Sequence, residues 1–325
     1  MSHALRLPSA AAPGTALIVA CLAATWLIWG STYLAIKWAL VSFPPYFQMG
    51  TRFVVAGLLL MAWARWRGGR DGAPGSKAGW PDAGQWFSAG VLGLLMIGGG
   101  YGATAVAQTS VSSGLVVAFI AVVPALVALM QVPYGVRPGR LEVLGIGLGL
   151  LGVVLLMRGQ GFAASPGGLV AMAVACFTWT LGSVWALHGL PGGRRLTLAD
   201  GAMGYGSQML AGGLLLMAAS WVAGESPQWP PDGRALVSWA YLVVAGSLIG
   251  FSAYMILLQR TSAALASSYT FVNPVIGLVL GVTLGGEVVT RGEWLAAAVI
   301  GAGVVLLLLA KSRPAASPSK PASSE

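Results

Sequence analysis

The residues of this chain that are able to do chemistry are few, and none of them forms a catalytic constellation. The two histidines, His3 and His188, are isolated, and no HExxH or GxSxG pattern is present. The two cysteines, Cys21 and Cys176, lie inside apolar runs, which is not typical of a disulfide framework or a metal site. We therefore predict a protein that is not an enzyme and that uses no cofactor and no metal.

Aromatic side chains inside long apolar runs are the first candidates for ligand binding. Each ring offers an apolar face, and Trp and Tyr add a polar group at the edge, which suits small amphipathic or aromatic solutes. Any single one of them could instead belong to the aromatic belt at the membrane interface. The residues that we expect to line a substrate cavity are Trp29, Tyr33, Tyr101, Trp179, Tyr254 and Tyr269.

Two prolines interrupt apolar runs at positions 150 residues apart, Pro124 and Pro274. A proline inside a helix removes one backbone hydrogen bond, and within a membrane the freed carbonyl must find another partner or a wet cavity. A matched pair of interrupted segments points to the binding site of a transporter. We predict that both prolines are hinges, with a static kink as the alternative. Asn273 directly precedes Pro274, and we predict that it contacts substrate.

Two bases, Lys37 and Arg52, lie inside apolar runs. A base within the membrane indicates a functional site, and either one could attract a carboxylate. The alternative is that each side chain extends to the outer interface. We predict Lys37 as a substrate-binding residue. No Asp or Glu falls near the middle of a run, which favours uniport or coupling by a route without buried carboxylates.

The composition indicates a polytopic helical membrane protein whose main partner is the lipid bilayer. Apolar residues make up 57% of the chain and charged residues only 8%, about a third of the charged fraction of a soluble domain. Since a spanning helix needs roughly 20 apolar residues, we expect ten, at 15–40, 45–66, 85–107, 111–132, 141–158, 167–188, 200–222, 235–258, 264–285 and 293–311. The net charge of +9 comes from short loops and does not indicate nucleic-acid binding.

The distribution of Lys and Arg predicts how the chain is oriented. If the N-terminus is cytoplasmic, 13 of the 18 bases lie in cytoplasmic segments, as the positive-inside rule requires. Both termini are then cytoplasmic in a multi-pass protein of the bacterial inner membrane. Residues 1–14 form an N-terminal tail, and residues 312–325, rich in Pro, Ser and Ala, are expected to be disordered.

An internal repeat is the most informative pattern in the sequence. Gly57–Ala62 recurs unchanged as Gly213–Ala218, Gln108 matches Gln259, and further matches follow in order with offsets of 150 to 156. We predict two five-helix repeats, at 15–160 and 164–311. Because five is odd, the second repeat enters the membrane inverted, which gives two states of similar energy for alternating access. The predicted fold is all-α, with ten transmembrane helices in two inverted repeats.

These residues resemble a known family. Trp26–Leu40, WLIWGSTYLAIKWAL, resembles the first-helix signature of EamA-type carriers of the drug/metabolite transporter superfamily, and Arg52-Phe53 resembles the start of their second helix. The block from Pro274 to Leu284–Glu287 resembles their Pro…Gly-Glu signature. After Gly135 the first repeat has Val136–Pro138 in place of an acid. The resemblance covers about 15–311 and implies an exporter of amino acids, other metabolites or drugs.

We therefore predict export of small metabolites, with amino acids, including aromatic and hydrophobic ones, as the favoured cargo. The first, third, fourth, sixth, eighth and ninth helices would line a midplane cavity, and the fifth and tenth would be scaffold. An exporter of drugs or of compounds resembling nucleotide sugars is the alternative within the superfamily. Outside it, the alternatives are an intramembrane enzyme and a membrane sensor or structural subunit. The oligomeric state is predicted to be a monomer or a homodimer.

Overall fold

The predicted all-α class is confirmed for the part of the chain that the structure describes. The computed structural model describes residues 13–70, 79–111, 116, 119–156, 165–285 and 290–310, and these residues form helices and no strand. Residues 1–12 of the predicted N-terminal tail lie outside the described residues, and its last two residues, Pro13 and Gly14, already belong to the first helix. The C-terminal tail, Glu287 and part of the fourth predicted span also lie outside the described residues.

The helices follow one another with short connections. In chain order they are α1 (Pro13–Ala39), α2 (Pro45–Arg70), α3 (Ala83–Leu92), η1 (Gly93–Gly102), α4 (Ala103–Ala107), α6 (Val123–Met130), η2 (Val132–Tyr134), α7 (Arg140–Leu156), α8 (Pro166–His188), α9 (Gly201–Val222), α10 (Gly233–Tyr241), η3 (Leu242–Phe251), α11 (Ser252–Arg260), α12 (Ala263–Ala266), α13 (Tyr269–Gly285) and α14 (Arg291–Leu309). These overlap each of the ten ranges predicted from the sequence.

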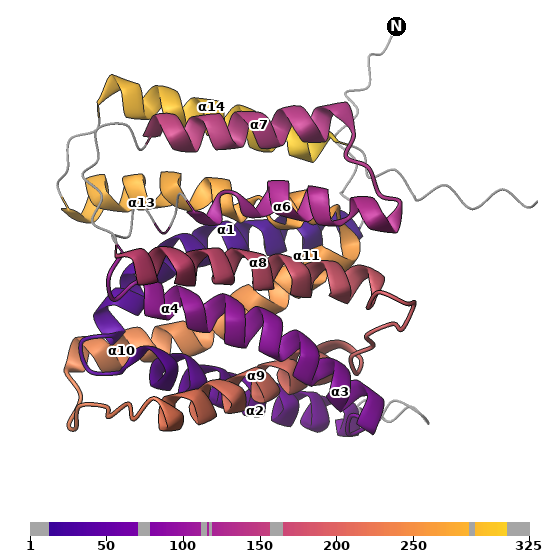
Figure 1. The fold of residues 1–325 in the computed structure, drawn as a ribbon, viewed down its shortest axis with the longest axis vertical. Coiled ribbons are helices and arrows are strands. Elements are labelled where there is room, and N and C mark those ends of the chain that lie inside the picture. The colour runs from indigo at the N-terminus through magenta and orange to yellow at the C-terminus, as the bar shows by residue number, and fades with distance from the viewer. Residues whose placement is uncertain are drawn as a thin grey trace, which may run out of the picture.

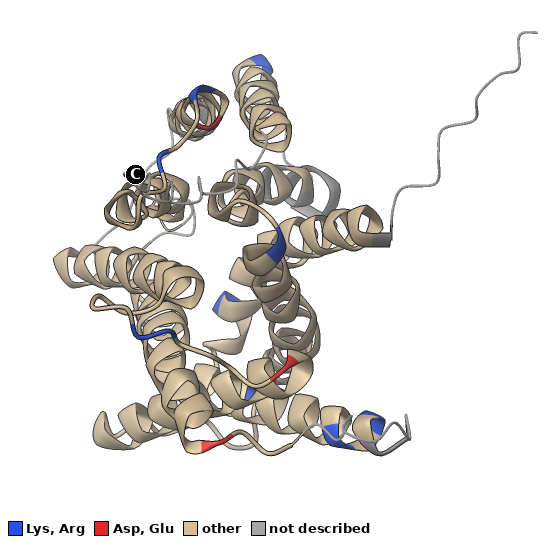
Figure 2. Cartoon of the chain, turned by 90° about the vertical axis from the view of Figure 1, so that its right-hand side faces the viewer, with Lys and Arg blue, Asp and Glu red and all other residues tan. Residues whose placement is uncertain are grey.

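Five helical stretches are long and apolar enough to cross a membrane. They are Gly14–Ala39, Pro45–Gly68, Ala83–Ala107, Pro166–His188 and Gly233–Arg260. Two shorter helices, Val123–Tyr134 and Trp294–Leu309, are also apolar. Lys, Arg, Asp and Glu are sparse along the described helices and lie mainly in loops and near helix ends (Figure 2). The chain is therefore a multi-pass membrane protein.

Several helices start at recognisable N-terminal caps. Asp82 precedes α3 and accepts a hydrogen bond from the Gln85 N–H, while the Gln85 side chain accepts from the Asp82 N–H. Ser165 accepts from the Gly168 N–H before α8, whose first residue is Pro166. Both caps satisfy N–H groups that a helix start leaves free. The sequence therefore determines where these helices begin.

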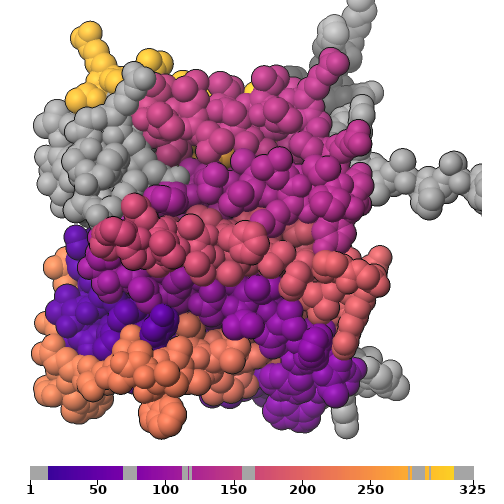
Figure 3. Space-filling model, viewed as in Figure 1, coloured from indigo at the N-terminus to yellow at the C-terminus, as the bar shows by residue number. Residues whose placement is uncertain are grey.

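The helices run side by side across the molecule and are stacked along its long axis (Figure 1). α7 and α14 pair at one end, and α2 and α9 pair at the other. On the face seen in Figure 3, α8 lies against α4, although they are separated in the chain by α6 and α7. The second helix of each repeat thus packs on its counterpart, and so does the fifth.

Glycines let both of these pairs approach closely. A Cβ on Gly57 of α2 would lie 2.7 Å from the Gly206 carbonyl oxygen of α9, and a Cβ on Gly206 would lie 3.0 Å from the Gly57 oxygen. The same reciprocal contact occurs between α7 and α14, where Cβ atoms on Gly145 and Gly303 would lie 2.9 and 2.8 Å from each other's carbonyl oxygens. Small residues at such contacts are typical of membrane helix packing.

The third helix of each repeat changes its winding over nearly the same stretch. η1 and η3 are both π-helices of ten residues, and they begin 149 positions apart, at Gly93 and Leu242. η1 follows α3 directly and continues into α4, and η3 follows α10 directly and continues into α11. π-Helical turns are rare and are often found at functional sites. Here they carry Tyr101 and Phe251, which contact Trp29 and Trp179 in the middle of the molecule.

Candidate functional site

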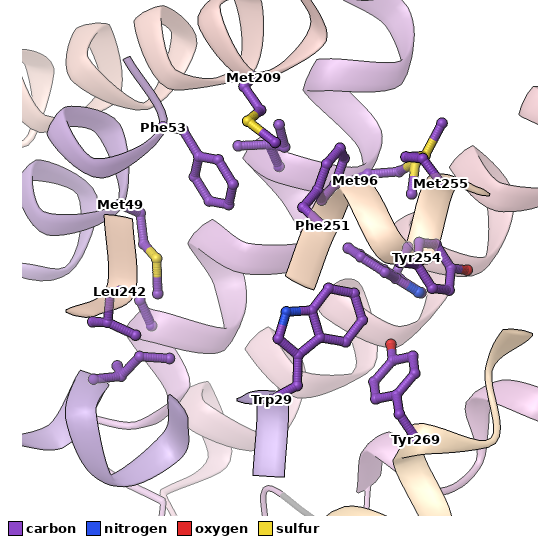
Figure 4. Packing of buried hydrophobic residues seen from close by; sticks show 14 of the residues in the cluster. Trp29, Met49, Phe53, Met96, Met209, Leu242, Phe251, Tyr254, Met255 and Tyr269 are labelled. Atoms are coloured by element: carbon purple, nitrogen blue, oxygen red, sulfur yellow. The ribbon is translucent and has the colours of Figure 1, made fainter. Parts of the chain in front are cut away.

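Trp29, in the middle of α1, is the centre of an aromatic cluster. Its ring centroid lies 4.5 Å from that of Tyr269, 5.5 Å from Tyr254, 5.7 Å from Trp179 and 6.3 Å from Tyr101. Most of these pairs meet edge to face, the arrangement that aromatic quadrupoles prefer. Figure 4 shows the Trp29 ring beside Tyr254 and Tyr269 and below Phe251. The cluster joins α1, η1, α8, α11 and α13, so it connects both repeats.

A cavity of about 60 Å³ lies against this cluster. Ligand pockets usually measure about 300–1,000 Å³, so the cavity as it stands is too small for a drug-sized molecule or an aromatic amino acid, and its aromatic walls must move apart to admit one. It is lined by Trp29, Thr32, Tyr33, Ile36, Gly100, Tyr101, Thr104, Ile120, Val123, Ala175, Cys176, Trp179 and Tyr269.

Hydrogen bonds hold the aromatic side chains in place. The Trp29 Nε1–H donates to the Gly246 carbonyl oxygen at 3.1 Å, and the Tyr254 hydroxyl lies 2.8 Å from the Ser183 hydroxyl. Asn273 Nδ2 donates to the Tyr33 hydroxyl at 3.3 Å, while its buried Oδ1 has no partner. A buried carbonyl oxygen without a donor is costly, and Asn273 is not itself part of the cavity lining. Its contact with substrate therefore stays a prediction.

The structure brings together seven of the eight residues predicted to bind substrate. Five of them line the cavity; Tyr254 packs behind Trp29 and Trp179, and Asn273 contacts Tyr33. Lys37 does not join them, because its side chain is exposed near the end of α1 and is not part of the cavity lining. Its position fits the alternative in which it extends to the interface.

The predicted lining helices need one correction. The first, third, fourth, sixth and ninth helices supply the cavity lining. The eighth, which comprises α10, η3 and α11, supplies no lining residue. Its contribution is indirect, since Phe251 and Tyr254 pack on Trp179, and Gly246 accepts the Trp29 hydrogen bond.

The two prolines occupy different places in their helices. Pro274 lies inside α13, where its ring removes an N–H donor from the helix. Pro124 lies in the first turn of α6, after a turn at Ala121 and Val122, and a proline there removes no helical hydrogen bond. The fourth helix is thus interrupted just before its proline, whereas the ninth continues through it.

Arg52 lies directly behind the cavity wall and is completely buried. Its Cζ is 5.1 Å from the ring centroid of Tyr101 and 4.8 Å from that of Phe53. Sequence reasoning singled out Arg52, and its burial argues against the alternative in which the side chain extends to the outer interface. Sequence reasoning missed Ser247, the partner of Arg52 in η3. The π-helical segments gave no signal in the sequence, because their residues are ordinary for an apolar helix.

A second, larger cavity of about 780 Å³ lies on the side of the molecule where α8 ends and α9 begins. Its walls include Leu17 of α1, Leu196–Ala202 between α8 and α9, and Gln259 and Arg260 of α11. The segment between α8 and α9 lies on the right in Figure 1. None of the residues lining this cavity lines the aromatic cavity. Among the described residues, no group of His, Cys, Asp and Glu is arranged to hold a metal.

The EamA-like transporter family matches this chain twice, at residues 15–158 and 166–309. The chain belongs to the EamA-like transporter family. Two copies of the EamA domain therefore account for nearly all of the described helices, which agrees with the repeat seen in the sequence.

Curated proteins similar to this chain include one that is named as an inner membrane transporter. The chain is 37% identical over 289 residues to the inner membrane transporter YedA of Escherichia coli strain K12, covering 89% of each chain. It is 27% identical to the chloroplastic WAT1-related protein At3g02690 of Arabidopsis thaliana, covering 82% of this chain and 64% of that one. It is 25% identical to protein PecM of Dickeya dadantii, covering 78% and 80%.

A crystal structure of a protein 20% identical in sequence superposes with a TM-score of 0.69, covering 91% of this chain and 97% of that one. At this identity the likeness shows the fold alone. The family match and the relatives together identify the EamA chain as a membrane transporter of the drug/metabolite transporter superfamily.

Proposed function

We propose that this EamA protein exports small metabolites, amino acids above all and aromatic and hydrophobic ones among them, across the bacterial inner membrane. The observation that carries the proposal is the aromatic cavity between the two repeats, where Trp29 and Tyr101 of the first meet Trp179 and Tyr269 of the second. Aromatic walls with a few polar groups suit amphipathic solutes.

The proposed architecture is ten transmembrane helices in two inverted repeats, at 15–160 and 164–311, with both termini cytoplasmic. Three observations support it. The π-helices η1 and η3 occur over nearly the same stretch of the third helix of each repeat, α2 packs on α9, and α7 packs on α14. A pseudo-twofold relation between inverted repeats pairs equivalent helices in this way.

Alternating access is the proposed mechanism. The aromatic cavity is small and the second cavity is wide. The wide cavity lies on the side of the molecule that carries Arg260 and the segment following α8. The positive-inside rule predicts that this side faces the cytoplasm. In the proposed mechanism the wide cavity is the cytoplasmic vestibule, and the aromatic side chains around Trp29 must move before cargo can pass between it and the aromatic cavity.

Counterflow in proteoliposomes tests the proposal. Purified protein is reconstituted without an ion gradient, and exchange is measured for a panel of radiolabelled amino acids, with a drug and a nucleotide sugar included. We expect exchange of a subset of amino acids that is lost in Trp29→Ala and retained in Trp221→Ala, whose ring is 84% exposed. Exchange of the drug or the nucleotide sugar alone would contradict the amino-acid assignment.

A further inference from the structure

Arg52 is a charged residue buried within the helical bundle. It lies in the second turn of α2, its side chain is 0% exposed, and the ring of Phe53 next to it is also fully buried. Arginine stays protonated in proteins, and an isolated charge in an apolar interior is costly unless it is paired. The position of Arg52 therefore calls for a partner of opposite charge.

No such partner is present among the described residues. Arg52 Nε donates to the Ser247 hydroxyl at 2.6 Å, and Nη1 lies 3.5 Å from the Met49 sulfur. Nη2 is buried and has no hydrogen-bond partner. A guanidinium has five N–H donors, so a neutral hydroxyl and a thioether leave most of its hydrogen-bonding capacity unused. The rings of Phe53 and Tyr101 stabilise the positive charge in part, but no carboxylate among the described residues neutralises it.

The unpartnered Nη2 of the guanidinium lies next to the wall of the aromatic cavity. A Cβ on Gly246 would be 2.8 Å from Arg52 Nη2 and 3.2 Å from the Thr32 methyl group, and Thr32 lines the cavity. The same Gly246 accepts the hydrogen bond of Trp29. Tyr101, another lining residue, covers the guanidinium with its ring. A small displacement of Tyr101 or Thr32 would open Nη2 to a ligand in the cavity.

We propose that Arg52 is the anion-binding group of the transport site, which pairs with an oxyanion of the cargo while the aromatic cavity receives its apolar part. The inference rests on the proposed function, because it requires that cargo reach this cavity. A guanidinium presents parallel N–H groups that match a carboxylate or a phosphate. The cargo class is therefore solutes that carry an oxyanion next to an apolar group.

The test compares charged and uncharged forms of the same solute. Phenylalanine and leucine are each measured against their carboxamides, which keep the side chain and remove the carboxylate, and a sugar phosphate is added as the phosphate arm. KM for counterflow is determined for the natural protein, Arg52→Gln and Arg52→Lys. Arg234→Gln is the matched control, because it removes the same charge from an exposed position in the first turn of α10. Thermal unfolding in detergent verifies that each variant is folded.

We expect the natural protein to prefer the acids over the amides. In Arg52→Gln, KM for the acids should rise about tenfold or more, as is typical when one partner of a buried charge pair is removed, and the preference for acids over amides should disappear. Arg52→Lys should give an intermediate KM, since lysine keeps the charge and loses the two parallel N–H donors. Arg234→Gln should leave KM for the acids unchanged.

The outcomes separate this inference from the proposed function. Amino-acid exchange with an unchanged KM and an unchanged acid preference in Arg52→Gln would overturn the role of Arg52 and leave amino-acid transport standing. Exchange of the sugar phosphate alone, lost in Arg52→Gln, would support the anion site and contradict amino acids as cargo. Exchange of neutral or cationic solutes only, unaffected by the variant, would overturn the anion site.

Discussion

Arg52 and Ser247 are joined by a 2.6 Å hydrogen bond between α2 of the first repeat and η3 of the second. At the repeat offsets of 156 and 151, their counterparts are Gln208 of α9 and Met96 of η1, and these two are also in contact, at 3.4 Å between Gln208 Nε2 and the Met96 sulfur. The second helix of each repeat thus reaches the π-helix of the other through one polar side chain. Only one of these two equivalent positions carries a charge.

Replacing Ser247 by alanine should weaken this connection and transport together. The change leaves Arg52 Nε without its acceptor, and an unsatisfied buried donor costs about 1–3 kcal/mol. We expect a lower melting temperature in detergent and reduced counterflow. For the melting temperature, Ser252→Ala is the matched control, because the Ser252 hydroxyl is buried without a hydrogen-bond partner. Equal effects of the two variants would show that the hydroxyl of Ser247 has no special role.

Trp29→Phe should be more stable than Trp29→Ala, but both variants should lose transport. Phenylalanine keeps an aromatic ring in the cluster and loses the Nε1–H bond to Gly246. Trp29→Ala removes the ring and should cost about 3–5 kcal/mol, as for other large-to-small core changes. Thermal unfolding and counterflow are measured for both variants. Full transport by Trp29→Phe would show that the hydrogen bond does not position the cavity wall.

Gly303 and Gly301 make a matched pair for the contact between α7 and α14. A Cβ on Gly303 would lie 2.8 Å from both the Gly145 oxygen and the Gly149 nitrogen, whereas a Cβ on Gly301 would meet nothing within 4 Å. Gly303→Ala should lower stability by about 1–3 kcal/mol through overpacking, and Gly301→Ala should be neutral or stabilising by up to about 1 kcal/mol. Thermal unfolding in detergent distinguishes them, and equal melting temperatures would contradict the close packing.

Pro274→Ala tests the predicted hinge. If α13 bends at Pro274 during gating, restoring the helical N–H should reduce the counterflow rate while the yield of folded protein stays the same. Pro124→Ala is the comparison, because Pro124 lies in the first turn of α6, where proline fits the helix, and we expect a smaller effect there. Unchanged transport by Pro274→Ala would favour a static kink.

Glu225, which belongs to the second repeat, caps the N-terminus of α2 in the first repeat. Its carboxylate accepts hydrogen bonds from the Tyr46 and Phe47 N–H groups at 3.1 and 2.7 Å. Glu225→Ala should destabilise the protein by about 0.5–2 kcal/mol, as the loss of a helix cap does. Asp200→Ala is the control, since Asp200 precedes α9 without capping it through its side chain. Similar melting temperatures for the two variants would contradict the capping role.

Much of this protein was determined by its sequence alone. Apolar runs of about 20 residues must become helices in a membrane, because only a helix satisfies its own backbone there, and helices overlap every range predicted from such runs. The repeat was visible because Gly57–Ala62 and Gly213–Ala218 are identical. The aromatic residues near the middle of their apolar runs could also be identified from the sequence. All six that we predicted to line a cavity belong to the cluster around Trp29 or line its cavity.

The tertiary structure decided which way each side chain faces. A helix that is apolar all round lacks the periodicity that marks a buried face, so the sequence could not distinguish Lys37, which is exposed, from Arg52, which is buried. The environment of Arg52 depends on Ser247, which is 195 positions away. A buried charge and its surroundings are set by the packing of helices from opposite repeats, and no local pattern records that packing.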